Sequence, residues 1–298
     1  MARSREGLAG TGSMAAMTAA PSPSTSTLAS ASATPSRSAP SDPVAELLRH
    51  AARTWIAPRF RHLGDDEVMQ KAPGEWVTTV DRDVEAFLTP ELLALAPGSR
   101  VVGEEQCAET PELLDHLDEG QVWLVDPLDG TFNFISGREP LSSMVALLED
   151  GVAVSAWMLD PIAGLLHHAR RGQGAWREGE RLRAASGPGL RRAVVKTRFL
   201  PPEDQARVAT WSGVEILPGL NCTGAEYPAL VHGDFDVTVY WRKLAWDHAP
   251  GTLFVTEAGG VAARFDGTPY RAGDRHPGLL VARSREVWDE AAAAWRTA

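Results

Sequence analysis

The segment from residue 123 to residue 131 reads WLVDPLDGT and joins an apolar run to two carboxylates that stand three positions apart. The apolar part has the length and the bounding residues of a buried strand, so Asp126 and Asp129 fall where that strand leaves the core. Two carboxylates this close repel each other unless a cation lies between them. Such hard oxygen ligands suit Mg²⁺, which takes one or two carboxylates together with water and phosphate oxygens. The segment therefore predicts a metal-assisted phosphate site at the end of a strand.

A long polar stretch precedes the part of the chain that can fold. Residues 1–41 are mostly Ala, Ser, Thr and Pro with almost no large apolar side chains, so we expect a disordered low-complexity tail. The tail holds three of the 29 basic residues and one of the 39 acidic ones, which leaves residues 42–298 with a formal charge of −12. This acidic balance argues against a broad basic face that binds duplex nucleic acid.

The compartment is inferred from what the chain lacks. No run of about 18 apolar residues occurs, so no membrane-spanning helix is expected, and the tail has no apolar segment of the secretory type. The two cysteines, Cys107 and Cys222, stand in unrelated contexts, which fits a reducing cytosol. We therefore expect a cytoplasmic protein. Import into an organelle, directed by the Arg-containing and Ser-rich tail, is the lesser alternative.

Hydrophobic periodicity divides residues 42–298 into two halves, with a boundary at the Ser-Gly-Pro-Gly stretch of residues 186–189. The first half, 42–187, is predicted to lay helices on an antiparallel sheet, and the second, 188–298, to alternate strands and helices as an α/β unit. Helices are expected over 43–60, 81–95, 203–210, 225–232, 247–258 and 285–295. Strands are expected over 100–102, 121–125, 141–148, 152–159, 165–170, 193–196, 214–217, 236–240, 261–265 and 279–282.

Acidic clusters recur at three expected strand ends or helix starts. They are Glu104 with Glu105, Asp126 with Asp129, and Asp247. One such cluster alone is more often a solvated surface or a helix cap. Their joint occurrence with neighbouring glycines favours a shared site.

The motifs around these acids resemble those of the inositol monophosphatase family. The matching stretches are VGEE at 102–105, DPLDGT at 126–131 and WDHAPG at 246–251, followed by EAGG at 257–260. They occur in order, and the resemblance covers residues 42–298. It implies an α+β or α/β fold built as a layered αβαβα sandwich. It also implies Mg²⁺-dependent hydrolysis of a phosphate monoester without a covalent intermediate, sensitivity to Li⁺, and often a homodimer.

The resemblance assigns metal ligands by position, for two or three Mg²⁺ ions per site. Glu104, Asp126 and the carbonyl of Leu128 would hold one ion, and Asp126, Asp129 and Asp247 would hold a second. The sharing of Asp126 is chemically reasonable, because an in-line displacement needs cations near both the attacking and the leaving oxygen.

Catalytic and phosphate-binding roles follow in the same way. Glu104 would act through the metal, Thr131 would orient the attacking water, and Asp81 would hydrogen-bond to Thr131 and help carry the proton. The backbone N–H groups of Gly130 and Thr131 would bind the phosphate, since glycine at the start of a turn allows close approach.

The substrate-reading positions depart from the inositol-specific pattern. Gly224-Ala225-Glu226 stands where that group has Gly-Thr-Ala, and Tyr240 stands where it has a glutamate that hydrogen-bonds to inositol hydroxyls. Glu226, Tyr240 and the nearby Arg242 are candidate substrate contacts. Aromatic and basic side chains there would favour a substrate with a nucleotide or a second phosphate. The alternative is that they are packing or surface residues without contact to the substrate.

Several functions therefore stay open. The leading one is hydrolysis of a small phosphorylated metabolite, either inositol monophosphate, histidinol phosphate, fructose bisphosphate or a 3′(2′),5′-bisphosphate nucleotide. An aspartyl-phosphate mechanism of the haloacid dehalogenase type is disfavoured, because its motif places the acids two apart and near the N-terminus. A non-catalytic regulator is disfavoured by the complete set of acids.

Overall fold

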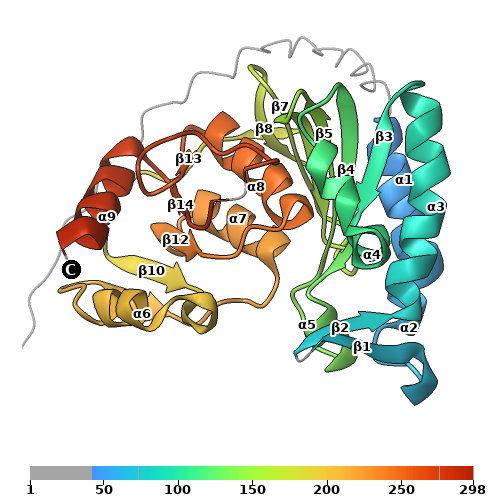
Figure 1. Cartoon of the computed structure of the whole chain (residues 1–298), viewed down its shortest axis with the longest axis horizontal. Coiled ribbons are helices and arrows are strands. Elements are labelled where there is room, and N and C mark those ends of the chain that lie inside the picture. The colour runs from blue at the N-terminus through green and yellow to red at the C-terminus, as the bar shows by residue number, and fades with distance from the viewer. Residues whose placement is uncertain (1–41, 73, 275, 298) are drawn as a thin grey trace, which may run out of the picture. The chain divides into compact units, whose positions relative to one another are not determined.

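The computed structural model describes residues 42–72, 74–274 and 276–297, so the tail predicted for residues 1–41 lies outside the described residues. In the described part, helices, a larger sheet, helices, a smaller sheet and helices follow one another as layers (Figure 1). Apolar clusters fill the spaces between these layers. The predicted αβαβα sandwich is confirmed.

Seven strands of the described residues form the larger sheet, in the order β3-β4-β5-β6-β7-β8-β9. All neighbours are antiparallel except β3, which runs parallel to β4. The prediction of an antiparallel sheet is wrong at this edge, because α4 (Glu104–Glu109) and a 3₁₀ helix (Pro111–His116) carry the chain back before β4 begins. The bounds are β3 Arg100–Gly103, β4 Gln121–Asp129, β5 Ser142–Glu149, β6 Val152–Leu159, β7 Leu166–Arg170, β8 Gly174–Arg177 and β9 Glu180–Leu182. The last two strands were not predicted from the sequence.

Amphipathic helices cover one face of the larger sheet. Leu48 and Leu88 are fully buried in the same cluster as Trp123 and Trp157 of the sheet. Asp42 caps the first helix, because its carboxylate accepts from the backbone N–H groups of the first turn. These helices are α1 (Pro43–Ala51), which continues through a π-helical turn (Ala52–Ile56) into α2 (Ala57–Arg59), and α3 (Thr79–Leu95).

The opposite face of the larger sheet packs on α7 and α8, and these in turn pack on the smaller sheet. Among the described residues that sheet has five strands in the order β11-β10-β12-β14-β13. Trp288 and Trp295 of α9 cover its outer face. The bounds are β10 Arg192–Val195, α6 Pro202–Ala209, β11 Glu215–Leu217, α7 Thr223–His232, β12 Val237–Tyr240, α8 Ala245–Glu257, β13 Val261–Ala263, β14 Leu279–Ala282 and α9 Arg285–Thr297.

A hairpin that the sequence did not predict precedes α3. Its strands, β1 (Val68–Ala72) and β2 (Glu75–Thr78), pair antiparallel, and Thr78 then caps α3. The hairpin lies near α5 (Thr131–Ile135), at the end of the sheet where β4 finishes (Figure 1). No helix in the described part of the chain combines the length and the apolar character needed to cross a membrane.

Candidate active site

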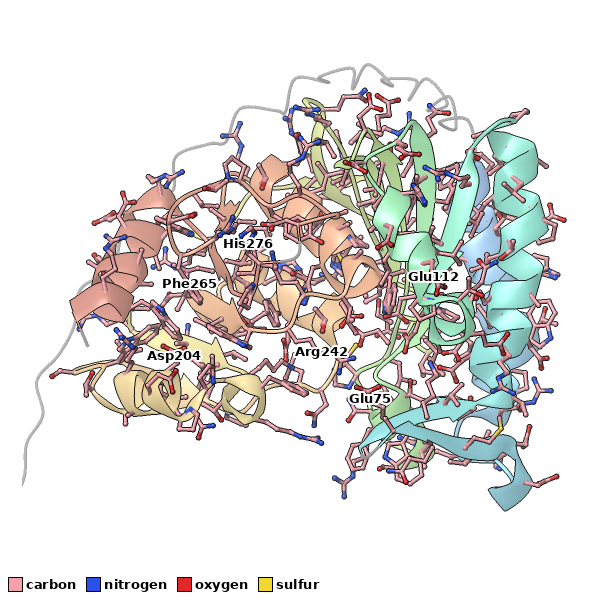
Figure 2. All side chains as sticks on the ribbon, viewed as in Figure 1. Glu75, Glu112, Asp204, Arg242, Phe265 and His276 are labelled. Atoms are coloured by element: carbon pink, nitrogen blue, oxygen red, sulfur yellow. The ribbon has the colours of Figure 1, made fainter. Side chains whose placement is uncertain are left out.

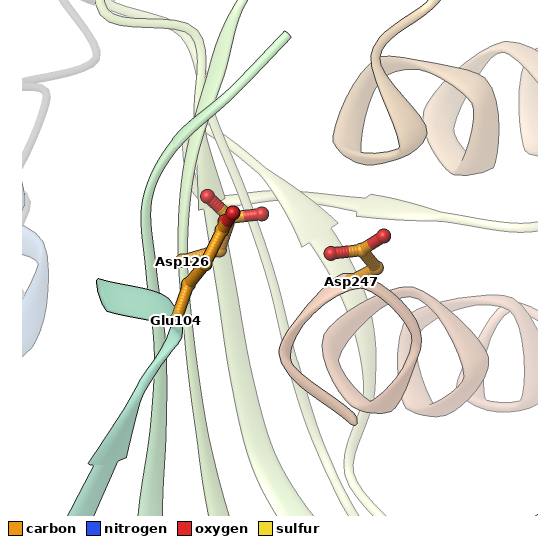
Figure 3. Close-up of side chains that lie close together, drawn as sticks. All are labelled: Glu104, Asp126 and Asp247. Carbon is orange, nitrogen blue, oxygen red and sulfur yellow. The ribbon is translucent and has the colours of Figure 1, made fainter. Parts of the chain in front are cut away.

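Three of the predicted metal ligands converge from different elements. Glu104 begins α4, Asp126 lies in β4, and Asp247 lies in the first turn of α8. One carboxylate oxygen from each lies within 4.8 Å of the other two. Figure 3 shows Glu104 and Asp126 together beside the sheet and Asp247 on the helix across from them. The structure therefore brings together acids from three separate parts of the sequence, of which Glu104 and Asp247 are 143 positions apart.

The backbone of β4 explains how Asp126 and Asp129 both reach this site. In a regular strand, residues three apart point to opposite faces of the sheet. Here Asp126 faces Met144 of β5 while Asp129 faces Ser142, so β4 contains one extra residue between them. This bulge turns both carboxylates toward the same cavity, which both of them line.

The electrostatics of the cluster favour a cation. Burial, followed by the charge of Glu104, raises the pKa of Asp126 well above its usual range. Burial and the charge of Asp129 do the same to the pKa of Asp247. Burial raises the pKa of Asp129 to about 6, against a hydrogen bond of 2.6 Å from the backbone N–H of Gly224. A divalent cation relieves this repulsion, and a set of carboxylate oxygens suits Mg²⁺.

A hydrogen-bonded triangle connects Thr131 to the residues predicted beside it. The Thr131 hydroxyl lies 3.2 Å from Asp81 Oδ1 and 3.0 Å from the carbonyl oxygen of Leu128. Asp81 is buried, and its other oxygen accepts from the backbone N–H of Thr78 at 2.9 Å and the hydroxyl of Thr78 at 2.5 Å. Burial raises the pKa of Asp81 to about 6. The structure therefore places a buried carboxylate behind the Thr131 hydroxyl, and its role as a proton acceptor stays a prediction.

Gly130 makes the turn between β4 and α5. Its φ of +88° lies in the left-handed region, which favours glycine. A Cβ here would also lie 3.1 Å from the carbonyl oxygen of Pro140. Gly130 and Thr131 both line the cavity that contains the acids, while the role of their N–H groups in phosphate binding stays a prediction.

Two charged residues at the site were missed in the sequence. Lys71 of β1 places its ammonium 3.1 Å from Glu104 and 2.5 Å from Glu105. Glu85 accepts from the N–H groups of Glu105 at 2.9 Å and Gln106 at 2.8 Å, and so caps the helix that begins with Glu104. Nothing in the sequence singles out Lys71. The spacing of Glu85, four residues after Asp81 on the same helix face, was a usable signal.

The three candidate substrate contacts occupy different depths. Arg242 lies on the cavity wall with its side chain 42% exposed, and it pairs with Glu75 of the hairpin (Figure 2). Tyr240 is 3% exposed, and Glu226 is fully buried beneath the wall. Substrate contact stays a prediction for all three residues.

Comparisons with known proteins show what the whole chain is similar to. The model of the inositol monophosphatase family matches residues 40–297. An inositol-1-monophosphatase of Rhizobium meliloti is 32% identical over 231 residues, which cover 73% of this chain and 84% of the relative. The Nus factor SuhB of Escherichia coli K12 is 30% identical over 236 residues, covering 76% and 86%. The structure of inositol monophosphatase II from Staphylococcus aureus superimposes with a TM-score of 0.70 at 24% identity, covering 84% of this chain and 90% of that one.

Proposed function

This chain belongs to the inositol monophosphatase family of phosphoric monoester hydrolases, and we propose that it hydrolyses a small phosphate monoester with a water activated by Mg²⁺. The observation that carries the proposal is the convergence of Glu104, Asp126 and Asp247 within 4.8 Å. Carboxylates so close, of which Asp126 is buried, repel one another and need a cation to stay ionised together.

The donor set at the site fits Mg²⁺. Glu104, Asp126 and the carbonyl of Leu128 would hold one ion, and Asp126, Asp129 and Asp247 a second, with two or three ions per site in all. When bound, Mg²⁺ supplies positive charge that activates a water and offsets charge on the phosphate and on the leaving oxygen. The bulge in β4 lets Asp126 and Asp129 serve the same site.

In this proposal Thr131 orients the attacking water and Asp81 accepts its proton. A hydroxyl has one proton, and that of Thr131 is within reach of the Leu128 carbonyl at 3.0 Å and of Asp81 at 3.2 Å. If the Leu128 carbonyl holds a metal ion, the proton would go to Asp81. The hydroxyl oxygen of Thr131 is then left to accept from the water and to orient it. Because burial raises the pKa of Asp81 to about 6, this carboxylate is a competent proton acceptor near neutral pH.

The backbone around Gly130 is suited to the phosphate. Without a Cβ, Gly130 lets the phosphate approach the N–H groups that begin α5. Phosphate oxygens there would lie beside the same acids that hold the metal, since all of these groups line one cavity. Binding and chemistry are thus combined at the end of β4.

The substrate is a small phosphorylated metabolite, with inositol monophosphate as the first candidate. A bisphosphate nucleotide, histidinol phosphate and fructose bisphosphate are the alternatives. The reason is that the residues expected to contact the non-phosphate part of the substrate depart from the inositol-specific pattern. We also propose a cytoplasmic location, in keeping with two buried free cysteines, and a homodimer, which light scattering on the purified protein would test.

A substrate panel tests the proposal. Phosphate release from inositol 1-phosphate, histidinol phosphate, fructose 1,6-bisphosphate and adenosine 3′,5′-bisphosphate is measured with and without Mg²⁺ and with added Li⁺. We expect release from at least one ester, strict dependence on Mg²⁺ and inhibition by Li⁺. No release from any ester by protein that binds Mg²⁺ would contradict the proposal and favour a non-catalytic regulator.

A further inference from the structure

An ammonium group lies in the wall of a cavity that Asp129 and Asp247 also line, and a hydrogen bond to a buried carboxylate fixes its position. Lys196 follows β10, and its Nζ lies 2.6 Å from Glu226 Oε1. The hydroxyl of Tyr240 donates to Glu226 Oε2 at 2.8 Å, and the backbone N–H of Leu220 donates to Oε1 at 2.8 Å. We call Lys196, Glu226 and Tyr240 the Lys196 cluster.

Within the Lys196 cluster, Glu226 is a support and not a contact surface. It is fully buried, and both of its oxygens accept hydrogen bonds. A buried carboxylate that is satisfied in this way fixes the position of its partner. Glu226 and Tyr240 therefore hold the end of the Lys196 side chain in one place.

Lys196 is the member of the cluster that reaches the cavity. Its side chain is 19% exposed and lines the same cavity as Asp129 and Asp247. An ammonium has three N–H donors, and among the described residues only the one toward Glu226 has a side-chain acceptor. The remaining donors are available to a molecule bound in the cavity.

The position of Lys196 points to the part of the substrate that it meets. Gly130, Thr131, Glu104 and Asp126 line one cavity. Lys196, Gly219 and Thr223 line the adjoining side, and Asp129, Asp247 and Arg242 line both. A substrate phosphate at the acids would extend its leaving group toward this side. The donors of Lys196 would then face the leaving group and not the scissile phosphate.

We propose that Lys196 binds a negatively charged group on the leaving part of the substrate, a carboxylate or a second phosphate, and thereby selects substrates that carry one. Glu226 and Tyr240 are positioning residues in this account. The inference rests on the proposed function, because it assumes that a phosphate ester is hydrolysed at the neighbouring acids. It adds a specificity that the metal ligands do not provide.

A matched pair of esters isolates this specificity. Glycerol 2-phosphate and 2-phosphoglycerate differ only in a hydroxymethyl group that is replaced by a carboxylate. We expect the full-length protein with Mg²⁺ to show a higher kcat/KM for 2-phosphoglycerate. In Lys196→Met the ratio of the two kcat/KM values should fall roughly 10- to 100-fold, which is the effect of one hydrogen bond to a charged group.

Control variants distinguish a direct contact between Lys196 and the substrate from the general electrostatic attraction of positive charges on the cavity wall. Lys196→Arg keeps the charge and should retain most of the ratio. Arg198→Met removes a positive charge from the same cavity wall and should change the ratio little. Lys196→Met combined with Glu226→Gln avoids an unpaired buried carboxylate, so a folded protein is obtained even if the single variant is unstable. This double variant should show the same loss of ratio.

The possible outcomes distinguish failure of the proposed role of Lys196 from failure of the proposed function. Equal kcat/KM values for the two esters, or an equal fall in the ratio for Arg198→Met and Lys196→Met, would overturn the role of Lys196 while leaving Mg²⁺-dependent hydrolysis in place. Absence of hydrolysis of any ester, in this pair and in the wider panel, would instead overturn the proposed function.

Discussion

The hydroxyl of Thr131 at the start of α5 lies 3.2 Å from the carboxylate of Asp81 in the first turn of α3. This contact joins the turn after β4 to the helix layer, across 50 positions of the sequence. It also puts a buried carboxylate behind the residue that we expect to orient the attacking water. The two side chains should therefore act as one unit in catalysis.

Replacing Thr131 by Val should lower kcat by about 100-fold or more, because the water loses its orienting group and its route for the proton. Asp81→Asn should have a comparable effect, and the double variant should be hardly worse than either single variant, since the two residues act together. Steady-state kinetics on the preferred substrate provide the measurement, with Thr131→Ser as the control that keeps the hydroxyl. Effects that multiply in the double variant would contradict a shared role.

Lys71 should compete with Mg²⁺ for Glu104. Its ammonium lies 3.1 Å from that carboxylate, and a positive charge so near weakens the attraction of a second cation. Lys71→Met should therefore lower the Mg²⁺ concentration for half-maximal activity severalfold, while Lys71→Arg should leave it close to the original value. A higher Mg²⁺ requirement in Lys71→Met would show instead that Lys71 supports the site.

Glu85 should act on the metal site without touching the metal. Its carboxylate caps α4 through Glu105 and Gln106, and so fixes the helix that begins with Glu104. Glu85→Ala should cost about 1 kcal/mol in the free energy of unfolding, as for other helix caps, and should raise the Mg²⁺ requirement. Gly103→Ala should do the same, because the new Cβ would overlap the Glu85 carboxyl group.

Denaturant unfolding and a Mg²⁺ titration of activity measure the two effects. A matched control is Glu286→Ala, which removes an acid from the first turn of α9, far along the chain from the site. If Glu85→Ala lost stability but kept its Mg²⁺ requirement, Glu104 would have to be fixed by other contacts.

Hydrophobic periodicity was sufficient for most of the helices and strands, whereas the αβαβα layers and the metal-ligand set with Glu104, Asp126 and Asp247 were predicted from the resemblance of the motifs. Apolar runs and helical periodicity depend on neighbours along the chain, and the motifs lie at the ends of the elements they predict. The parallel pairing of β3 with β4 was missed because a strand does not encode the direction of its partner. The hairpin of β1 and β2 was missed because its short, half-buried strands have no clear alternation.

Buried charged residues are the part of the site that the sequence did not reveal. Glu226 is a candidate substrate contact because it stands in the stretch that contacts the sugar ring in the family that the chain resembles, and the sequence does not show how deeply it is buried. In the structure it is fully buried, and its partners Lys196 and Tyr240 are 30 and 14 positions away. Such long-range hydrogen bonds depend on how the sheets stack, which no local pattern reports. The same holds for Lys71, which reaches Glu104 from 33 positions away.

His167 should make the protein less stable in mild acid. Burial lowers the pKa of His167 from its ordinary value of 6.5 to about 4, and the neighbouring His232 adds to this effect. Between pH 6.5 and pH 4 the unfolded chain therefore binds a proton that the folded protein does not, so the free energy of unfolding falls as the pH falls. His167→Leu should remove up to about 3 kcal/mol of this fall.

Urea unfolding at pH 7 and pH 4.5 gives this comparison. His116→Leu is the control, because His116 is exposed and lies beside Glu119 on the surface. An identical loss of stability between the two pH values in the original protein and in His167→Leu would mean that His167 titrates normally in the folded state.

The central claim is that the acids at the end of β4 hold the Mg²⁺ that hydrolysis requires, and a Mg²⁺ titration of phosphate release tests it most directly. The original protein and Asp129→Asn are compared on the preferred ester, with thermal unfolding to show that the variant is folded. The account predicts release that rises with Mg²⁺ and disappears with a chelator, and no turnover by Asp129→Asn. Release that persists in the chelator, or near-original activity of Asp129→Asn, would contradict it.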